Sequence, residues 1–390
     1  MLALGRKRSV IREIFEYGNQ RKKEIGPENV FDFSLGNPSV PPPQAFSDAL
    51  SRLIRDTDPA VLHAYTSAPG DAEVREAVAK DIRERFHAPA EGRLVYMTAG
   101  AAASLTITLS ALCVPGDEVI VLAPFFTEYS VFVAQAGARL VAVPVAAGDF
   151  QLDGDALSQA VTPRTKAVLI NSPNNPTGAV LNEGSIRTLA GILSDKAARF
   201  GHPIYLISDE PYRELVYGGV KAPFVSNYYK NTVICYSFSK SLSLPGERIG
   251  YILISPEAED CQEMFLAVCG AGRALGFVCA PSLFQRAAAQ CLGMTSDLSV
   301  YDTNRRLLYD GVTNCGFRAV KPDGAFYLFM QSPEPDANRF CEKAKEMELL
   351  LVPGDDFGCE GYVRIAYCVS TDMIRRSLPA FQKLAQAYHL

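Results

Sequence analysis

Seven short apolar runs, rich in β-branched residues, recur between about residue 94 and residue 254, and they constrain the fold more than any other feature of the chain. The segments between them are long enough to form helices. The runs are Leu94–Thr98, Glu118–Ala123, Leu140–Val145, Ala167–Asn171, Ile204–Ser208, Thr232–Tyr236 and Gly250–Ile254. Apolar runs that alternate with helix-length segments are typical of an α/β fold. We therefore expect these runs to be strands of one sheet.

Several of these runs are apolar throughout and do not alternate between apolar and polar residues. Strands that helices cover on both faces have this composition, which is typical of parallel sheets. The intervening segment Ser185–Phe200 has the pattern of an amphipathic helix. We predict a mostly parallel central sheet with flanking helices, and in such sheets ligands bind beyond the carboxyl ends of the strands.

The two ends of the chain have a different pattern and predict a smaller α+β domain. The N-terminal stretch through NPSVPPPQAF is proline-rich and extended. After about residue 285 a long helical segment precedes two strand-like runs, Ala325–Met330 and Tyr362–Ala366, and a closing helix. We predict an N-terminal arm and part of the small domain at 1–45, a large domain at 46–284, and the rest of the small domain at 285–390.

Composition narrows the class of protein. A chain of 390 residues that is 48% hydrophobic can bury a sizeable core, and its net charge of −5 gives no basic stripe for nucleic acid. The N-terminus has no apolar leader segment and no later stretch reaches the length of a membrane span, so we expect a cytoplasmic protein. The ten cysteines include no CxxC pair and the four histidines lie far apart, so we expect no metal site.

Small or polar residues follow the predicted strands, at the edge where a ligand should bind. Gly100-Ala101-Ala102 opens a helix, which suits either a phosphate at the helix N-terminus or a simple packing turn. Asn175 lies in the turn NNPTG, where Asn and Gly also have ordinary structural roles. Each of these motifs is open to both interpretations when taken alone.

Two charged residues at strand ends indicate a catalytic or cofactor-binding role more strongly than these motifs do. Asp209 ends an apolar run, and a buried carboxylate needs a partner such as a protonated pyridine nitrogen, a salt bridge or a helix N-cap. Lys240, in SFSKSLSLPGERIG, follows a strand through a serine-rich turn, where partial burial would lower the pKa of its amine and make it nucleophilic. The serines and Arg248 could together bind a phosphate.

The order and spacing of these motifs resemble the class I and II aminotransferases, which are pyridoxal-phosphate (PLP) enzymes of fold type I, over most of the chain. The resemblance implies that Lys240 holds PLP as a Schiff base and that Asp209 pairs with the pyridine nitrogen. It implies that Asn175 and Tyr212 bond to the phenolic oxygen, and that Phe126 of PFFTEY stacks on the ring where many relatives have Trp or Tyr. The implied phosphate contacts are Gly100, Ala101, Ala102, Ser237, Ser239 and Arg248.

The same resemblance implies how substrate and a second subunit take part. Arg364 of YVRIAY would bind the substrate α-carboxylate, beside the loop at Gly36. Tyr65 of HAYTSAPG would contact the cofactor phosphate in the neighbouring subunit, which implies a homodimer. Arg273 falls near the position at which some relatives bind a side-chain carboxylate of the substrate across the dimer. The surrounding sequence GAGRALGFVCAP departs from the family motif, and the alternative is an arginine on a surface or interface helix.

The implied activity is ping-pong transamination, in which Lys240 also moves a proton. We expect aspartate or glutamate as the amino donor, with 2-oxoglutarate or oxaloacetate as the acceptor, and alanine or aromatic amino acids as alternatives. The same fold also serves C–S β-lyases, decarboxylases and condensing synthases. The effector domain of a transcription regulator is disfavoured because we find no basic helix-turn-helix segment before residue 31.

Overall fold

All seven apolar runs form strands of one sheet, in the order β2-β8-β7-β6-β5-β3-β4. The computed structural model describes residues 2–6 and 10–390, so residues 1 and 7–9 of the predicted N-terminal segment lie outside the description. The strands are β2 (Val95–Thr98), β3 (Glu118–Ala123), β4 (Arg139–Pro144), β5 (Thr165–Asn171), β6 (Tyr205–Asp209), β7 (Thr232–Ser237) and β8 (Gly250–Ile254). Among these strands only β8 runs opposite to the direction that the other six share. The prediction of a mostly parallel sheet is confirmed.

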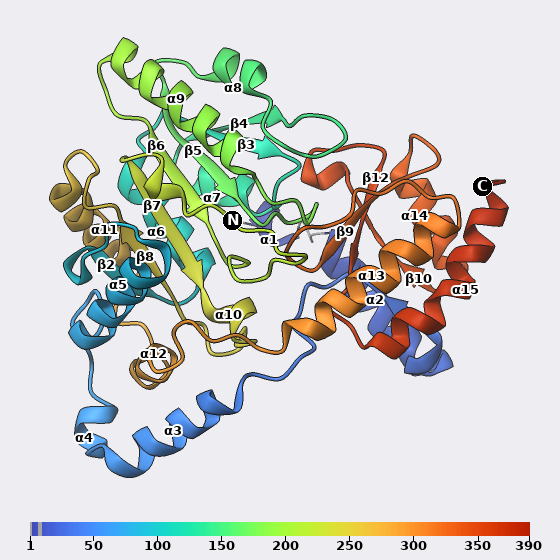
Figure 1. The fold of residues 1–390 in the computed structure, drawn as a ribbon, viewed down its shortest axis with the longest axis horizontal. Coiled ribbons are helices and arrows are strands. Elements are labelled where there is room, and N and C mark those ends of the chain that lie inside the picture. The colour runs from blue at the N-terminus through green and yellow to red at the C-terminus, as the bar shows by residue number, and fades with distance from the viewer. Residues whose placement is uncertain (1, 7–9) are drawn as a thin grey trace.

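Helices cover both faces of this sheet, which explains why the strands are apolar throughout. In β3, Val119 and Val121 pack toward one face, whereas Ile120 and Leu122 pack toward the other. The first face is covered by α6 (Ala101–Leu112), α7 (Tyr129–Gln135) and α11 (Cys261–Leu275). The second face is covered by α5 (Ala72–Phe86), α8 (Gly154–Ala160), α9 (Glu183–Phe200) and α12 (Ser282–Ala289), whereas α3 (Gln44–Asp56) packs against α12 farther from the sheet (Figure 1).

The helix α9 illustrates how local sequence sets an element. The Asn182 side chain caps its N-terminus by accepting a hydrogen bond from the backbone N–H of Ser185. Its buried residues include Ile186 and Leu189, three residues apart, which places them on one face. Gly201, with φ of 74°, ends the helix in the left-handed conformation that glycine adopts without strain. The predicted helix Ser185–Phe200 is therefore confirmed, and it begins two residues earlier, at Glu183.

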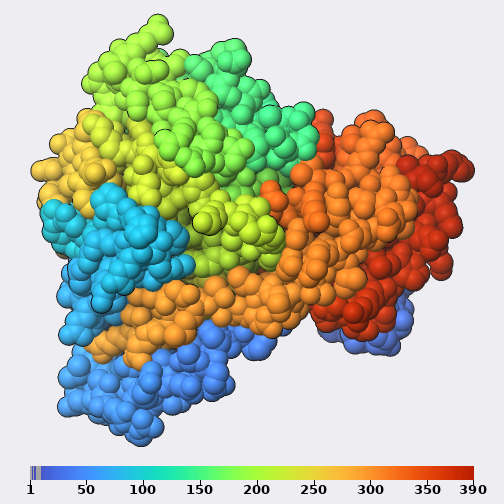
Figure 2. Space-filling model, viewed as in Figure 1, coloured from blue at the N-terminus to red at the C-terminus, as the bar shows by residue number. Residues whose placement is uncertain are grey.

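The two chain ends form the smaller part of the molecule. Figure 2 shows the C-terminal residues, orange to red, as a separate lobe with blue N-terminal residues against its lower edge. Its antiparallel sheet contains β11 (Val352–Pro353), β12 (Tyr362–Ala366) and β9 (Tyr327–Gln331), and β1 (Phe31–Asp32) pairs in parallel with β10 (Leu349–Leu350). Its helices are α2 (Val10–Ile25), α13 (Leu298–Asn314), α14 (Ala337–Lys345) and α15 (Thr371–Ala387). The exact domain bounds at residues 45 and 284 stay a prediction.

The remaining elements are short. They are α1 (Leu2–Arg6), α4 (Pro59–Leu62), α10 (Phe238–Ser241) and the single-turn 3₁₀ helices Pro27–Asn29, Gly92–Leu94, Val225–Asn227 and Asp355–Phe357. Across residues 2–6 and 10–390, no helix is long and apolar enough to cross a membrane.

Candidate active site

The lysine singled out by the sequence lies in α10, directly after β7. The side chain of Ser237 caps this short helix, so Lys240 projects from the carboxyl edge of the sheet into a cavity. Its Nζ donates a hydrogen bond to the backbone oxygen of Gly36 at 2.7 Å. Burial lowers the pKa of Lys240 to about 8, and the positive charges of Arg248 and Arg364 act in the same direction against an opposing effect of Cys368. A large fraction of the amine is therefore unprotonated, and nucleophilic, near pH 8.

Asp209, the last residue of β6, faces the same cavity and is 5% exposed. Its Oδ2 accepts a hydrogen bond from the hydroxyl of Tyr129 at 2.5 Å. Its Oδ1 is buried and has no hydrogen-bond partner among the residues that the structure describes. Burial raises the pKa of Asp209 to about 7, although the Tyr129 hydroxyl opposes this shift. The free oxygen can accept one further bond, and a cationic N–H donor would stabilise the ionised form.

The N-terminus of α6 forms an anion-binding corner. Gly100 precedes the helix with φ of 87°, and a Cβ built at this position would lie 2.8 Å from Nη2 of Arg248. Glycine therefore permits the guanidinium to approach the free backbone N–H groups of the first helical turn. The hydroxyls of Ser237 and Ser239, which are 2.7 Å apart, also line the cavity. Helix N–H groups, a guanidinium and hydroxyls together suit a phosphate.

A second buried cation faces the cavity from β12. Arg364 is 2% exposed, and it donates hydrogen bonds to Asn175 Oδ1 at 3.0 Å and to the backbone oxygen of Ser34 at 2.5 Å. Its Nε has no partner among the described residues, and burial lowers the pKa of the guanidinium. The two bonds use two of the five N–H donors of an arginine. The group is therefore a buried cation that an anion would stabilise.

The cavity between these groups has a volume of about 300 Å³. The structure brings together twelve of the residues that the sequence assigns to the site. They are Gly36, Ala101, Ala102, Phe126, Asn175, Asp209, Tyr212, Ser237, Ser239, Lys240, Arg248 and Arg364. Gly100 lies directly beside Arg248.

Besides Gly100, two predicted site residues do not line the cavity of this single chain. Tyr65 is 95% exposed, and Arg273 is exposed on α11. The resemblance implied that both act across a subunit interface, so their roles stay a prediction.

Three polar residues of the site were not predicted. Asn171, the last residue of β5, accepts a hydrogen bond from the backbone N–H of Asn175 at 2.7 Å, and its position at a strand end was a usable signal. Tyr129 lies three residues after Phe126 in the same motif, a spacing that could have indicated it. The Tyr327 hydroxyl lies 2.8 Å from that of Tyr212, and nothing in the sequence around it points to the site.

Among the described residues, no group of three His, Cys, Asp or Glu side chains could hold a metal ion. Enzymes that activate amino acids through PLP need a lysine amine to hold the cofactor and a carboxylate to keep its ring nitrogen protonated. Both groups lie at the carboxyl edge of this sheet, beside an anion-binding helix N-terminus. These features define the class: a PLP-dependent enzyme of fold type I.

Comparison with known proteins specifies the family. The model of the family "Aminotransferase class I and II" matches residues 28–381, and the chain belongs to this family. It is therefore a PLP-dependent aminotransferase.

Individual relatives are similar over nearly their whole length. An aspartate/prephenate aminotransferase of Thermus thermophilus is 30% identical over 90% of each chain, and an aromatic-amino-acid aminotransferase of Thermococcus litoralis is 28% identical over 96% of this chain and 95% of the relative. Among solved structures, an aminotransferase from Eubacterium rectale is 53% identical with a TM-score of 0.98 and covers 100% of this chain and 98% of its own. The aspartate aminotransferase of Thermus thermophilus with maleate is 28% identical with a TM-score of 0.86 over 98% of each chain.

Proposed function

We propose that this enzyme moves the amino group of L-aspartate or L-glutamate to 2-oxoglutarate or oxaloacetate by a ping-pong mechanism. The main support is Arg364, a buried guanidinium that faces the cavity with an unpartnered Nε and no carboxylate partner among the described residues. An arginine in this situation suits the α-carboxylate of an amino acid, which it binds at two points. Relatives named aspartate aminotransferase support a dicarboxylic donor.

The residues present fit PLP in two respects. The orphan Oδ1 of Asp209 is suited to accept a hydrogen bond from a protonated ring nitrogen. The absence of a Cβ at Gly100 lets the Arg248 guanidinium lie close to the helix N-terminus, so that a phosphate there would meet both groups, with Ala101, Ala102, Ser237 and Ser239 as further contacts. In this proposal Phe126 stacks on the ring, Asn175 and Tyr212 bond to the phenolic oxygen, and Tyr65 of a second copy of the chain reaches the phosphate.

PLP, when bound, acts as an electron sink that weakens the bonds to the Cα of an attached amino acid. Lys240 supplies the neutral amine that holds the cofactor, and once released it takes the proton from the substrate Cα. Arg364 fixes the α-carboxylate, and the loop at Gly36 lies beside it. Asp209, held by the Tyr129 hydroxyl, would stabilise positive charge on the ring nitrogen, and that charge would in turn favour its ionised form.

The test is a panel of half-reactions in which single amino acids are mixed with the PLP-loaded enzyme and the cofactor absorbance is followed. We expect aspartate or glutamate to react fastest, and Lys240→Ala to lose both the response and the lysine-dependent absorbance band. Faster reaction of alanine or aromatic amino acids would reject the proposed substrate. Near-normal transamination by Lys240→Ala would reject the assignment of the lysine.

Among the described residues, the cations that line the cavity are Lys240, Arg248 and Arg364, and each already has a proposed role. For a second carboxylate on the substrate we propose Arg273 from another copy of the chain as the partner. We expect Arg273→Ala to weaken reaction with aspartate and to leave reaction with alanine unchanged.

Release of pyruvate and ammonia from cysteine without a 2-oxo acid would instead identify a β-lyase.

A further inference from the structure

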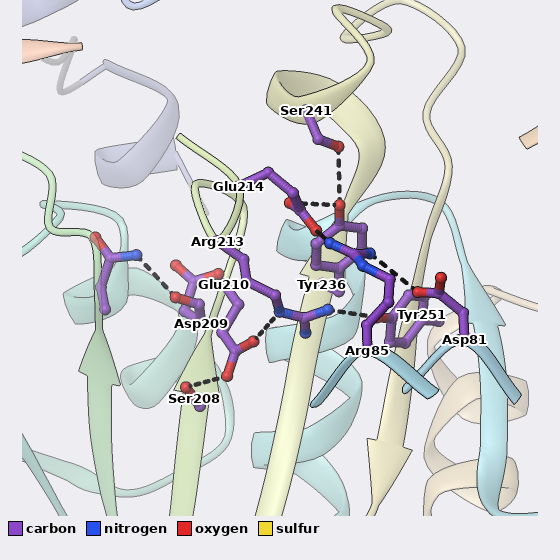
Figure 3. A network of polar contacts seen from close by, with 11 residues as sticks. Asp81, Arg85, Ser208, Asp209, Glu210, Arg213, Glu214, Tyr236, Ser241 and Tyr251 are labelled. Atoms are coloured by element: carbon purple, nitrogen blue, oxygen red, sulfur yellow. Dashed lines mark hydrogen bonds and ion pairs between the residues drawn. The ribbon is translucent and has the colours of Figure 1, made fainter. Parts of the chain in front are cut away.

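A buried polar network lies behind the active site, on the face of the sheet that α5 covers (Figure 3). We call it the Arg213 network, and it consists of Ser208, Glu210, Arg213, Glu214, Tyr236, Ser241 and Tyr251, with Arg85 and Asp81 of α5 at its edge. None of these residues lines the cavity. The proposed reaction therefore assigns no role to the buried ion pair of Arg213 and Glu210 in this network.

The network begins beside Asp209. Asp209 points toward Tyr129 on one face of the sheet, and its neighbours in the chain point to the opposite face. There the hydroxyl of Ser208 donates a hydrogen bond to Glu210 Oε1 at 2.8 Å. Glu210 is 3% exposed, so its carboxylate is a buried charge that requires a partner.

Arg213 is that partner, and it closes the turn after β6. Its Nε donates to Glu210 Oε2, and its Nη1 donates to the hydroxyl of Tyr251 at 3.0 Å. The guanidinium lies 4.4 Å from the centre of the Tyr236 ring. Because the ion pair joins the first and last residues of this short turn, it restrains Tyr212, which lies within the turn.

The same network reaches the turn that contains Lys240. The Tyr236 hydroxyl donates to Glu214 Oε2 at 2.9 Å and shares a hydrogen bond with Ser241 Oγ at 2.8 Å. Ser241 directly follows Lys240 in α10. The Tyr236 and Tyr251 rings stack with their centres 4.9 Å apart across the β7–β8 pair. Contacts centred on Arg213 and Tyr236 thus connect both turns that face the cofactor site.

We propose that Arg213 is a positioning residue, which through Glu210 and Tyr236 sets the distance between the turn bearing Asp209 and Tyr212 and the turn bearing Lys240. The proposal rests on the cofactor-binding roles assigned to these residues under the proposed function. In the proposed function, Asp209 of one turn bonds to the nitrogen of the rigid cofactor ring, and Lys240 of the other turn binds the cofactor covalently. Both bonds can form only if the distance between the two turns is fixed. Displacement of reacting groups by about 1 Å can lower a rate on the order of a hundredfold.

The test uses the PLP-loaded enzyme and the double variant Glu210→Gln/Arg213→Met. The double variant removes both charges, so it leaves no lone buried charge and should unfold near the wild-type temperature. We expect the pH midpoint of the lysine-dependent absorbance band to shift by about half a unit or more. We also expect the half-reaction rate constant to fall about tenfold or more, with the saturation constant for the amino acid changed less than about twofold.

A matched control is Glu118→Gln at the opposite edge of the sheet. Glu118 is likewise buried and bonds to Arg139 and Arg164, far from the cavity residues. This variant should unfold at a lower temperature with an unchanged absorbance midpoint and rate constant. If the double variant behaves in the same way, Arg213 is only structural and the proposal is overturned.

Tyr236→Phe tests the link to Lys240 separately and removes only one hydroxyl. We expect a smaller shift of the absorbance midpoint in the same direction, and no shift in a folded Tyr236→Phe protein would also overturn the proposal. Failure of the proposed function has a different signature, because the wild-type enzyme itself would then show no absorbance band that depends on Lys240.

Discussion

At the scale of single residues, the site is defined by two cations that the fold removes from water without a carboxylate partner among the described residues. The pKa of Lys240 and that of Arg364 are both lowered, chiefly by burial. Asp209 is the complementary case, since burial raises its pKa. Burial therefore destabilises the charged form of each group, and a ligand of opposite charge would offset this effect. This arrangement favours an anionic ligand with a cationic ring nitrogen.

Arg364→Lys should mainly weaken amino-acid binding. An ammonium group is a single point charge and cannot reproduce the planar fork, and the bonds to Asn175 and Ser34 would not both be kept. We expect the saturation constant for the amino acid to rise about tenfold or more, with a smaller effect on the maximal half-reaction rate. Stopped-flow absorbance at varied amino-acid concentration measures both quantities. Unchanged saturation would count against this role of Arg364.

The lowered pKa of Lys240 predicts the pH dependence of cofactor loading. Below about pH 8 the amine is protonated and cannot attack an aldehyde, whereas above it the free amine predominates. The rate of PLP binding to the cofactor-free enzyme should therefore rise through about pH 8 and level off above it. An exposed lysine would give a rise near its ordinary pKa of about 10.4. A midpoint there would contradict the burial of Lys240.

The sequence predicted the residues of the site that belong to contiguous motifs at strand ends, such as Lys240 and Asp209. It did not predict Tyr129, because the hydrogen bond to Asp209 joins residues 80 positions apart and depends on how α7 packs against the sheet. Tyr327 was missed for a similar reason, since it reaches Tyr212 from the smaller lobe. Contacts of this kind follow from packing between elements, so the spacing within a motif can indicate a residue such as Tyr129 but not the partner to which it bonds.

At the scale of elements, strand existence was predictable and strand direction was not. A strand buried on both faces is apolar in either direction, so nothing in the run Gly250–Ile254 indicated that β8 is antiparallel to β2 and β7. The strands β1, β10 and β11 have two residues each, which is too short for any periodicity. The start of α6 was predictable, because Gly100 has a specific conformational reason to be there.

Gly100→Ala should weaken cofactor binding, because the added methyl group meets Arg248 at the helix N-terminus. Gly116→Ala is a matched control, since Gly116 also has a positive φ but open space around a built Cβ. Both variants should lose about 1 to 3 kcal/mol of unfolding free energy from backbone strain. Only Gly100→Ala should raise the dissociation constant of PLP, measured by fluorescence titration. Equal PLP affinity in the two variants would contradict a phosphate site at α6.

At the scale of the whole molecule, the segment of α3 and α4 projects from the large lobe at the lower left of Figure 1. It exposes apolar side chains, with Ile54 59% and Val61 54% exposed, and Tyr65 follows directly. Exposed apolar residues that gather on a projection are typical of an interface. They support the prediction of a homodimer with shared sites.

Mixed dimers of two inactive variants test this prediction. If Tyr65 serves the neighbouring site, a hybrid of Lys240→Ala and Tyr65→Ala subunits contains one site with both residues intact. Mixing the variants under conditions of subunit exchange should then restore activity to about a quarter of that of the wild-type enzyme. No recovery, despite hybrids detected by mass spectrometry, would mean that Tyr65 does not act across the interface.

The parallel pairing of Phe31 in β1 with Leu349 in β10 has a consequence for synthesis of the chain. About 300 residues are made between the two strands, which takes roughly 15 to 60 s at the usual rates of translation. During this time the N-terminal segment has no strand to pair with. The backbone oxygens of Ser34 and Gly36 likewise receive their hydrogen bonds only after Arg364 and Lys240, respectively, have been synthesised. The central sheet can form on the ribosome, but the amino-acid binding site is completed only after nearly the whole chain has emerged.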